Sequence, residues 1–341
     1  MDLDLMARRR GEPLSILVTR LRYLGDVILT TPALAALKSR YPEAKIDYLT
    51  EDPYGNVLHG NPYVDEIITT GGTFFGTVAR LWRRRYTAAI DLFYNPRSAW
   101  LLYIARIPVR LGGSRRWRKR LYTHTFTVPA EIRSAVSHHL YPFRMLGVRE
   151  KASLPRVYID RDELEEGKML LERVSGRVDG VVAMHCGGTW QAKRWSPRNF
   201  AALADMILER TGMSVLVIGG PGEEEIVRAV QQRSGGDLRS LPAQPVRRLA
   251  SVLARCSAVI ANDGGVMHLS VALGRPTVGI FGPTEPDIWF PYEGKGPFAL
   301  ATLKAECAPC HRHECEDLKC LDGIHPDFVF EKLEGVLSWK R

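Results

Sequence analysis

Long apolar runs are missing from this 341-residue sequence. No run approaches the ~20 residues that a transmembrane helix needs, so we predict no membrane-spanning segment. The basic stretch Arg8–Arg10 leads into a short apolar run, without the longer apolar region and cleavage site of a signal peptide. Short-period repeats and low-complexity tracts are also lacking. We therefore expect a cytoplasmic, globular protein.

Four functional signatures are missing as well. Residues 19–26, which follow the first predicted strand, lack the G-x-G-x-x-G pattern, and this argues against a dinucleotide-dependent oxidoreductase. No obvious Asp-x-Asp metal signature follows a predicted strand. The net charge is +9, but neither a helix-turn-helix nor an RNA-binding sheet signature is present. We therefore expect no nucleic-acid partner, and a basic RNA-binding protein is the weaker alternative.

The overall composition of the chain is ordinary, but its arginines are unevenly distributed along the sequence. A hydrophobic content of 45% and 341 residues predict two globular domains, each with its own core. Arginines crowd the first half, and Trp82, Trp100, Trp117 and Tyr122 lie among them. Part of this charge is expected on solvated faces. Tryptophan beside arginine also suits an anionic membrane surface, where each basic residue contributes about 1 kcal/mol.

Strand-length apolar runs alternate with helical patterns in both halves. Predicted strands are residues 15–19, 45–50, 64–68 and 88–92, then 180–185, 214–220, 258–261 and 276–281. Predicted helices include one with Pro32 in its early turns that ends before Pro42, and residues 78–85, 197–210, 226–230, 246–254 and 327–339. The alternation favours an α/β fold with parallel, doubly wound sheets. The charged run 149–179 is expected to connect the two domains.

The stretch 261–270 (ANDGGVMHLS) follows one of these strands and opens a helix that ends near Gly274. Two glycines at such a turn admit a positive φ and let a ligand approach the main chain. The first N–H groups of the helix and its dipole favour an anion. We expect a nucleotide phosphate at this end of the sheet; an ordinary strand-to-helix turn without a ligand is the alternative.

Five short motifs follow one another along nearly the whole chain. They are LGDV at 24–27 with TPAL at 31–34, KRWS at 193–196, GGPGE at 219–223, DGGVMH at 263–268 and GIFGPT at 279–284. Together they resemble the ADP-heptose:lipopolysaccharide heptosyltransferases of glycosyltransferase family 9. The resemblance implies a GT-B fold, in which two Rossmann-like domains with parallel, doubly wound sheets face a central cleft. Residues 1–160 would bind the acceptor, residues 161–325 the nucleotide sugar, and the helix in 326–341 would pack back on the N-terminal domain.

The resemblance assigns the catalytic groups. Asp26 is the expected base, which takes a proton from the acceptor hydroxyl as it attacks the anomeric carbon; such a base contributes roughly 10²–10⁴-fold. A helix-terminus Asp stabilised by the dipole is the alternative. Lys193 is expected to neutralise the diphosphate leaving group, with Arg194 as an alternative carrier. With Lys193 and a helix end in that role, catalysis requires no metal cofactor.

The remaining donor contacts are expected from loops that follow strands. Gly188 and Thr189 would supply a backbone N–H and a hydroxyl to the phosphates, and Glu223 would accept from a ribose. Asp263 would face sugar hydroxyls, because a carboxylate repels phosphate. Gly264, Gly265 and His268 complete the expected donor site.

The acceptor implied by the resemblance is the inner core of lipopolysaccharide, which carries phosphates and acidic Kdo sugars. Guanidinium groups match both kinds of anion. We expect the acceptor site to include basic residues of the first half: Arg97, Arg115, Arg116 and Arg120. The enzyme would then work at the inner face of the cytoplasmic membrane, in peripheral contact with its anionic surface.

Four of the six cysteines are dense near the C-terminus. Cys307, Cys310, Cys315 and Cys320 enclose His311 and His313 and could hold a structural zinc or iron, although only the first pair has the CxxC spacing. Cys186 and Cys256 are expected to be lone buried thiols.

The predicted function is an inverting, metal-independent transfer of heptose from ADP-heptose to Kdo–lipid A or to a heptose already on it. A relative with another donor sugar or a protein acceptor is the first alternative, and the oxidoreductase is the second.

Overall fold

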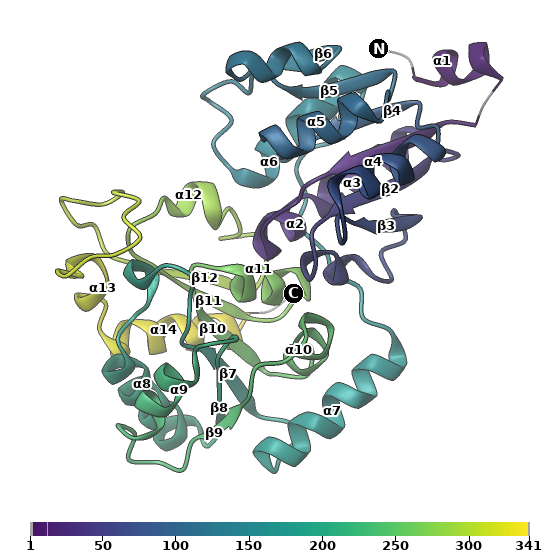
Figure 1. The fold of residues 1–341 in the computed structure, drawn as a ribbon. Coiled ribbons are helices and arrows are strands. Elements are labelled where there is room, and N and C mark those ends of the chain that lie inside the picture. Colours follow the sequence, from purple (N-terminus) through teal and green to yellow (C-terminus); the bar gives the residue numbers. More distant parts are fainter. Residues whose placement is uncertain (1–2, 12, 340–341) are drawn as a thin grey trace. The chain divides into compact units, whose positions relative to one another are not determined.

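A computed structural model describes residues 3–11 and 13–339. The chain divides into two compact units between Tyr158 and Ile159, and we predicted the boundary two residues later. Each unit contains one six-stranded, fully parallel sheet covered by helices (Figure 1). The predicted α/β architecture with two parallel sheets is therefore confirmed.

The first unit has the sheet order β3-β2-β1-β4-β5-β6. Its strands are β1 (Ser15–Thr19), β2 (Lys45–Thr50), β3 (Glu66–Thr69), β4 (Ala88–Asp91), β5 (Val109–Gly113) and β6 (His124–Phe126). Its helices are α1 (Leu3–Arg10), α2 (Leu24–Leu29), α3 (Thr31–Arg40), α4 (Phe74–Arg83), α5 (Pro96–Ile104) and α6 (Ala135–Leu140), with 3₁₀ segments η1 (Tyr54–Leu58), η2 (Arg116–Leu121) and η3 (Tyr141–Leu146).

The second unit has the equivalent order, β12-β11-β10-β7-β8-β9. Its strands are β7 (Val181–His185), β8 (Ser214–Ile218), β9 (Arg239–Leu241), β10 (Ala258–Asn262), β11 (Thr277–Phe281) and β12 (Phe298–Thr302). Its helices are α7 (Arg161–Ser175), α8 (Pro197–Thr211), α9 (Glu224–Gln231), α10 (Val246–Leu253), α11 (Gly265–Ala272), α12 (Pro286–Trp289), α13 (Lys319–Asp322) and α14 (Pro326–Leu337), with the 3₁₀ segment η4 (Gln191–Lys193).

The strand order reverses at one point in each sheet. In the first unit β1 lies between β2 and β4, and in the second β7 lies between β8 and β10. Loops leaving the carboxyl ends of strands beside such a reversal diverge to opposite faces of the sheet and leave room for a ligand. The loops after β1, β4, β7 and β10 are therefore where the fold favours a site.

The central strands are buried on both faces, as a parallel sheet covered by helices requires. All five residues of β7, β10 and β11 are buried. This explains why their sequences are continuous apolar runs instead of an alternating pattern.

The last helix differs from the expectation. Val329, Phe330, Leu333 and Val336 of α14 are buried in the core of the second unit. The helix packs on α8 and on β10 to β12. Its apolar face thus lies within the second unit, whereas we expected it to pack on the N-terminal domain.

The single helix expected around Pro32 is interrupted. Thr30 ends α2 and precedes α3, and its hydroxyl donates to the Val27 carbonyl 2.7 Å away. Pro32 follows as an early residue of α3, where its missing N–H costs nothing.

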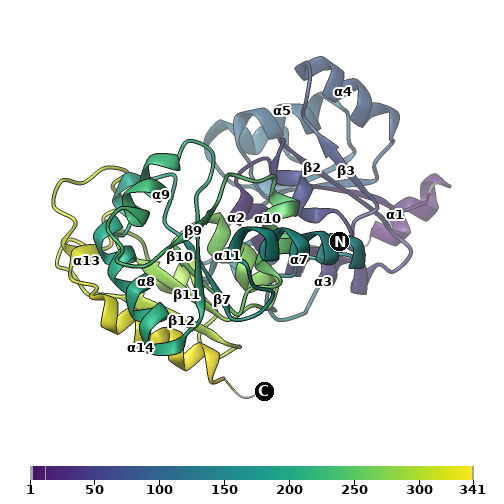
Figure 2. The same ribbon diagram turned by 90° about the horizontal axis from the view of Figure 1, so that it is seen from below.

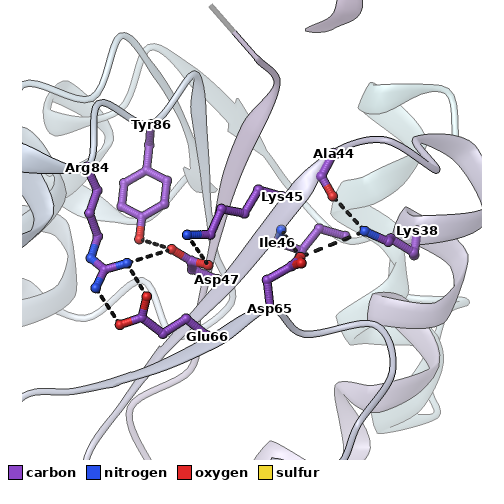
Figure 3. A network of polar contacts seen from close by, with 9 residues as sticks. All are labelled: Lys38, Ala44, Lys45, Ile46, Asp47, Asp65, Glu66, Arg84 and Tyr86. Atoms are coloured by element: carbon purple, nitrogen blue, oxygen red, sulfur yellow. Dashed lines mark hydrogen bonds and ion pairs between the residues drawn. The ribbon is translucent and has the colours of Figure 1, made fainter.

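A buried charged network connects β2 and β3 to the segment before β4 (Figure 3). The side chain of Asp47 is 1% exposed and accepts a hydrogen bond of 2.7 Å from the Tyr86 hydroxyl. Arg84 pairs with Asp47 at 3.3 Å and also with Glu66. Burial raises the pKa of Asp47, and the bonds from Tyr86, Lys45 and Arg84 oppose this effect. A buried carboxylate needs such partners, so the network fixes the positions of β2 and β3.

Within the described ranges 3–11 and 13–339, no helix is both long and apolar enough to cross a membrane.

Candidate functional site

In the first unit, Asp26 lies in α2, directly after the loop that leaves β1. Its side chain is 14% exposed. One carboxylate oxygen is 2.5 Å from the guanidinium of Arg20, and the other accepts from the Tyr23 N–H at 3.3 Å. Arg20 also donates to the Leu92 carbonyl at 3.0 Å, and so it ties the loop after β1 to the loop after β4. The expected catalytic carboxylate therefore lies at the reversal point of its sheet, paired with a fixed cation.

A histidine that we did not predict approaches the same carboxylate. Nε2 of His139, in α6, is 4.0 Å from the Asp26 carboxylate. Burial, together with the charge of Arg20 and the neighbouring His138, holds the pKa of His139 well below its usual value, so the ring is neutral near pH 7. Nothing in the dipeptide His138-His139 pointed to this position, because α6 comes more than a hundred residues after α2.

One of the four expected acceptor arginines lies in α5, and the other three lie in or beside η2. Arg97, near the start of α5, pairs with Glu51 at 2.7 Å, and Glu51 also pairs with Arg22. Arg115 lies 5.3 Å over the Tyr94 ring. Arg116 and Arg120 lie in η2 with exposed side chains. All four belong to the first unit, three of them in one short segment after β5.

In the second unit, Asn262 at the end of β10 joins the two loops of the reversal point. Its amide donates to the Cys186 and Gly187 carbonyls at 3.1 and 2.9 Å. Its oxygen accepts from the Trp195 N–H at 3.1 Å. The loop after β7 is therefore fixed to the end of β10. We did not predict this role, although Asn262 is the residue before Asp263 in the motif.

Lys193 and Asp263 form an ion pair of 2.6 Å at this point. The Lys193 ammonium also lies 4.3 Å from the centroid of the Trp190 ring, and Asp263 accepts from the Thr284 hydroxyl at 2.6 Å. Because Asp263 is only two residues before the first residue of α11, the pair lies beside the start of that helix. A cation and a helix N-terminus in one place can together neutralise an anion.

Glu223 does not have the environment that we expected. One of its oxygens accepts from the Gly188 N–H at 2.7 Å, and the other accepts from the Gly220 N–H at 2.6 Å and lies 3.4 Å from His185. Burial alone would raise the pKa of Glu223, but these partners hold it at about 2. The carboxylate thus fixes the loop after β7, and the Gly188 N–H that we assigned to a phosphate donates to Glu223 instead. Thr189, next in the chain, is exposed.

Gly187 shows how closely this loop approaches Glu223. A Cβ at Gly187 would lie 1.7 Å from a Glu223 oxygen, so any other residue there would displace the carboxylate from its bonds to this loop. Gly264 is different, because its φ of 176° is extended backbone that any residue adopts. The positive φ that we expected at this turn is therefore not found at Gly264.

Helix α11 begins at Gly265, and among the described residues no side chain caps its first turn. His268 lies within this helix and is buried, with Nδ1 2.8 Å from the Tyr292 hydroxyl. The ring is thus held by Tyr292, and its expected contact with the donor stays a prediction.

The cysteine-rich segment is not arranged as a metal centre. Across residues 3–11 and 13–339, no three His, Cys, Asp or Glu side chains are placed to hold a metal ion. Cys307 is exposed and Cys320 is buried, and burial with the neighbouring thiols raises the pKa of Cys320. His311 pairs with Glu285 at 3.0 Å, and His313 stacks on Trp190 at 4.0 Å. The zinc or iron site considered from the sequence is thus unsupported.

The two remaining cysteines match their prediction. Cys186 and Cys256 are fully buried, and burial raises the pKa of both thiols, that of Cys256 to about 12.

Two parallel sheets of equivalent order, each with charged side chains in the loops at its reversal point, define a pair of Rossmann-like domains suited to a nucleotide ligand. The model of glycosyltransferase family 9 (heptosyltransferase) matches residues 77–321. The chain belongs to this family and is a glycosyltransferase with the GT-B fold.

Several proteins are similar over nearly their whole length. Lipopolysaccharide heptosyltransferase 1 of Pseudomonas aeruginosa is 27% identical over 359 residues, covering 94% of this chain and 98% of the relative. The structure of a family 9 glycosyl transferase from Veillonella parvula has a TM-score of 0.83 at 25% identity, covering 95% and 97%. The structure of Escherichia coli ADP-heptose lps heptosyltransferase II also has a TM-score of 0.83, at 23% identity, covering 95% and 98%.

Proposed function

We propose that this glycosyltransferase moves heptose, with inversion, from ADP-L-glycero-D-manno-heptose to the Kdo–lipid A or heptose inner core of lipopolysaccharide. The observation that carries the proposal is the placement of Asp26 and Lys193. Each lies in the loop region after a strand at the reversal point of its own sheet, which is where this fold binds ligands. The names of the similar proteins support ADP-heptose as the donor and lipopolysaccharide as the acceptor.

The proposed reaction is a single displacement in which Asp26 and Lys193 act on opposite ends of the transfer. The acceptor hydroxyl oxygen attacks the anomeric carbon of the heptose while Asp26 takes the hydroxyl proton. The bond between the anomeric carbon and the diphosphate oxygen breaks, and ADP leaves with the bonding electrons. Attack from the side opposite the leaving group inverts the anomeric configuration.

Lys193 stabilises the leaving diphosphate in this proposal. Its ammonium is paired with Asp263, 2.6 Å away. The diphosphate takes up the ammonium together with the first N–H groups of α11, and the charge that develops on ADP is neutralised without a metal ion. Asp263 then turns to hydroxyls of the sugar. Glu223 acts as a positioning residue, because it holds the loop that carries Lys193.

The acceptor side of the proposal rests on positive charge. Arg115, Arg116 and Arg120 present guanidinium groups from one segment, and Arg97 adds a fourth. Such groups bind the carboxylates of Kdo and the phosphates of lipid A in bidentate fashion. Because this acceptor is a lipid, the enzyme acts at the inner face of the cytoplasmic membrane.

Calorimetric titration of the full-length protein with ADP, UDP, GDP and NAD in the presence of EDTA tests the donor assignment. We expect ADP to bind tightest, and Lys193→Ala to weaken ADP binding about tenfold, since one charge-assisted contact is lost. Lys304→Ala removes an exposed lysine of the same unit and is the matched control. Preference for UDP or GDP would indicate another donor sugar, preference for NAD would revive the oxidoreductase, and unchanged ADP affinity in Lys193→Ala would remove Lys193 from the site.

A further inference from the structure

We propose that the outer face of α4, α5 and η2 docks the enzyme on an anionic phospholipid bilayer. The two helices lie side by side in the first unit (Figure 2), and α5 also packs on η2. This surface would make the membrane contact of the proposed function, and its biological setting rests on that function. The physical argument rests on the apolar, aromatic and charged groups that this face presents.

Helix α4 presents an apolar face to solvent. Phe75 is 73% exposed and Trp82 is 59% exposed, which are large fractions for such side chains. They lie seven positions apart on one face of α4, and between them on that face are Ala79, which is half-buried, and Val78, which is buried in the core. These four residues and Ile104 line a shallow groove. Exposed apolar side chains gathered in this way mark an interaction surface.

Aromatic rings continue this surface along α5. Trp100 and Tyr103 are exposed, with their rings 5.8 Å apart, and the exposed Trp117 of η2 lies 6.2 Å from Trp100. Ile104, which lines the groove, lies four positions after Trp100 in α5, so the groove and the Trp100 ring share one face of this helix. Tryptophan and tyrosine favour the boundary between lipid and water, because one part of the ring system is apolar and another is polar.

Two arginines occupy equivalent positions after the two helices. Arg85 follows α4 with φ 51° and Arg106 follows α5 with φ 55°, both in the left-handed region where glycine is the usual residue. Both line one pocket of about 250 Å³, together with Trp82 and Tyr86. A glycine would suit this backbone better, so both arginines hold it at a conformational cost. Two guanidinium groups at one pocket beside an exposed indole suit the phosphate of a lipid headgroup.

The segment of chain that forms this surface carries almost only positive charge. Between residues 67 and 130 the only acidic residue is Asp91, which is buried and accepts from the Tyr122 hydroxyl at 2.7 Å. The same stretch contains basic residues at positions 80, 83–85, 97, 106, 110, 115, 116 and 118–120. Some of these bond within the unit, as Arg84 and Arg80 do. Two acidic side chains from outside this stretch pair with its arginines, Glu66 with Arg84 and Glu51 with Arg97. The remaining positive excess complements an anionic bilayer, and the exposed aromatic rings favour lipid over an acidic protein partner.

Vesicle flotation of the full-length protein tests this surface. One set of vesicles is phosphatidylcholine alone, and the other is an equal mixture of phosphatidylcholine and phosphatidylglycerol. We expect binding to the mixed vesicles only, weakening as salt is added. Phe75→Ser/Trp82→Ser and Arg85→Gly/Arg106→Gly should each lower the partition constant at least about tenfold. The glycine pair keeps the left-handed backbone, so it removes charge without strain.

Matched controls come from the second unit. Trp339→Ser removes another exposed tryptophan, and Arg228→Ala/Arg233→Ala removes two exposed arginines; both should bind vesicles like the unaltered protein. ADP affinity, measured on every variant, separates this result from a failure of the proposed function. Absence of binding to mixed vesicles, equal binding to both kinds of vesicle, or unchanged binding by both α4–α5 double variants would each overturn the proposal.

Discussion

At the scale of single residues, Asp26 combines an ion pair with Arg20 and partial exposure, and both matter for a base. The cation holds the carboxylate in place, and the exposed part gives an acceptor hydroxyl access. Asp26→Asn cannot take the proton, so we expect turnover to fall roughly 10²–10⁴-fold while ADP affinity stays the same. Steady-state rates together with calorimetry measure the two effects. Asp52→Asn, an exposed change in the same unit, should be silent; full turnover in Asp26→Asn would exclude Asp26 as the base.

The lowered pKa of Glu223 leads to a prediction about how the stability of the protein depends on pH. Its pKa of about 2 in the folded protein lies below the usual 4.5, so the stabilisation is fully present above pH 4.5 and is lost as the pH falls toward 2. Glu223→Gln should remove about 1–3 kcal/mol at pH 7 and should flatten this acid dependence. Urea unfolding of both proteins at several pH values measures the difference. The exposed neighbour Glu224→Gln is the control, and an acid dependence that is unchanged in Glu223→Gln would contradict the assignment.

At the scale of elements, α14 belongs to the core of the second unit. Leu333 is fully buried there, so Leu333→Ala should cost about 2–5 kcal/mol through lost burial and the cavity left behind. Urea unfolding followed by circular dichroism measures the loss. Glu331→Ala on the exposed side of the same helix should change stability by less than about 0.5 kcal/mol. Equal midpoints for the two variants would mean that the helix contributes nothing to this core.

The strands show how much of the fold could be predicted from the sequence. The central strands β1, β2, β4, β7, β8, β10 and β11 were found, because burial on both faces leaves continuous apolar runs. The strands β5, β6, β9 and β12 were missed. β5 contains Arg110 and two glycines, and β6 and β9 are three residues each, so neither periodicity nor composition marks them.

For the site, too, one part could be predicted from the sequence and another could not. The motifs placed Asp26, Lys193 and Asp263 beside the reversal points, because loop position follows from strand order. The partner of each group could not be read from the sequence. The pairs Lys193–Asp263 and Gly188–Glu223 join residues 70 and 35 positions apart, and packing decides which side chains meet.

At the scale of the whole molecule, the chain contains two sheets of equivalent topology with different chemistry. The first unit carries the proposed base and most of the clustered arginines, which suit an anionic acceptor. The second carries the lysine and the helix end that suit a nucleotide diphosphate. This division of labour is what the proposed transfer requires, since donor and acceptor are unlike anions.

The most direct test of this account is the transfer reaction itself. The full-length protein is incubated with ADP-heptose and Kdo–lipid A in EDTA, the lipid product is analysed by mass spectrometry, and its anomeric configuration by NMR. The account predicts a lipid that is heavier by one heptose, with inverted anomeric configuration and one ADP released per transfer. No transfer from ADP-heptose, or transfer that depends on added metal or retains the configuration, would contradict it.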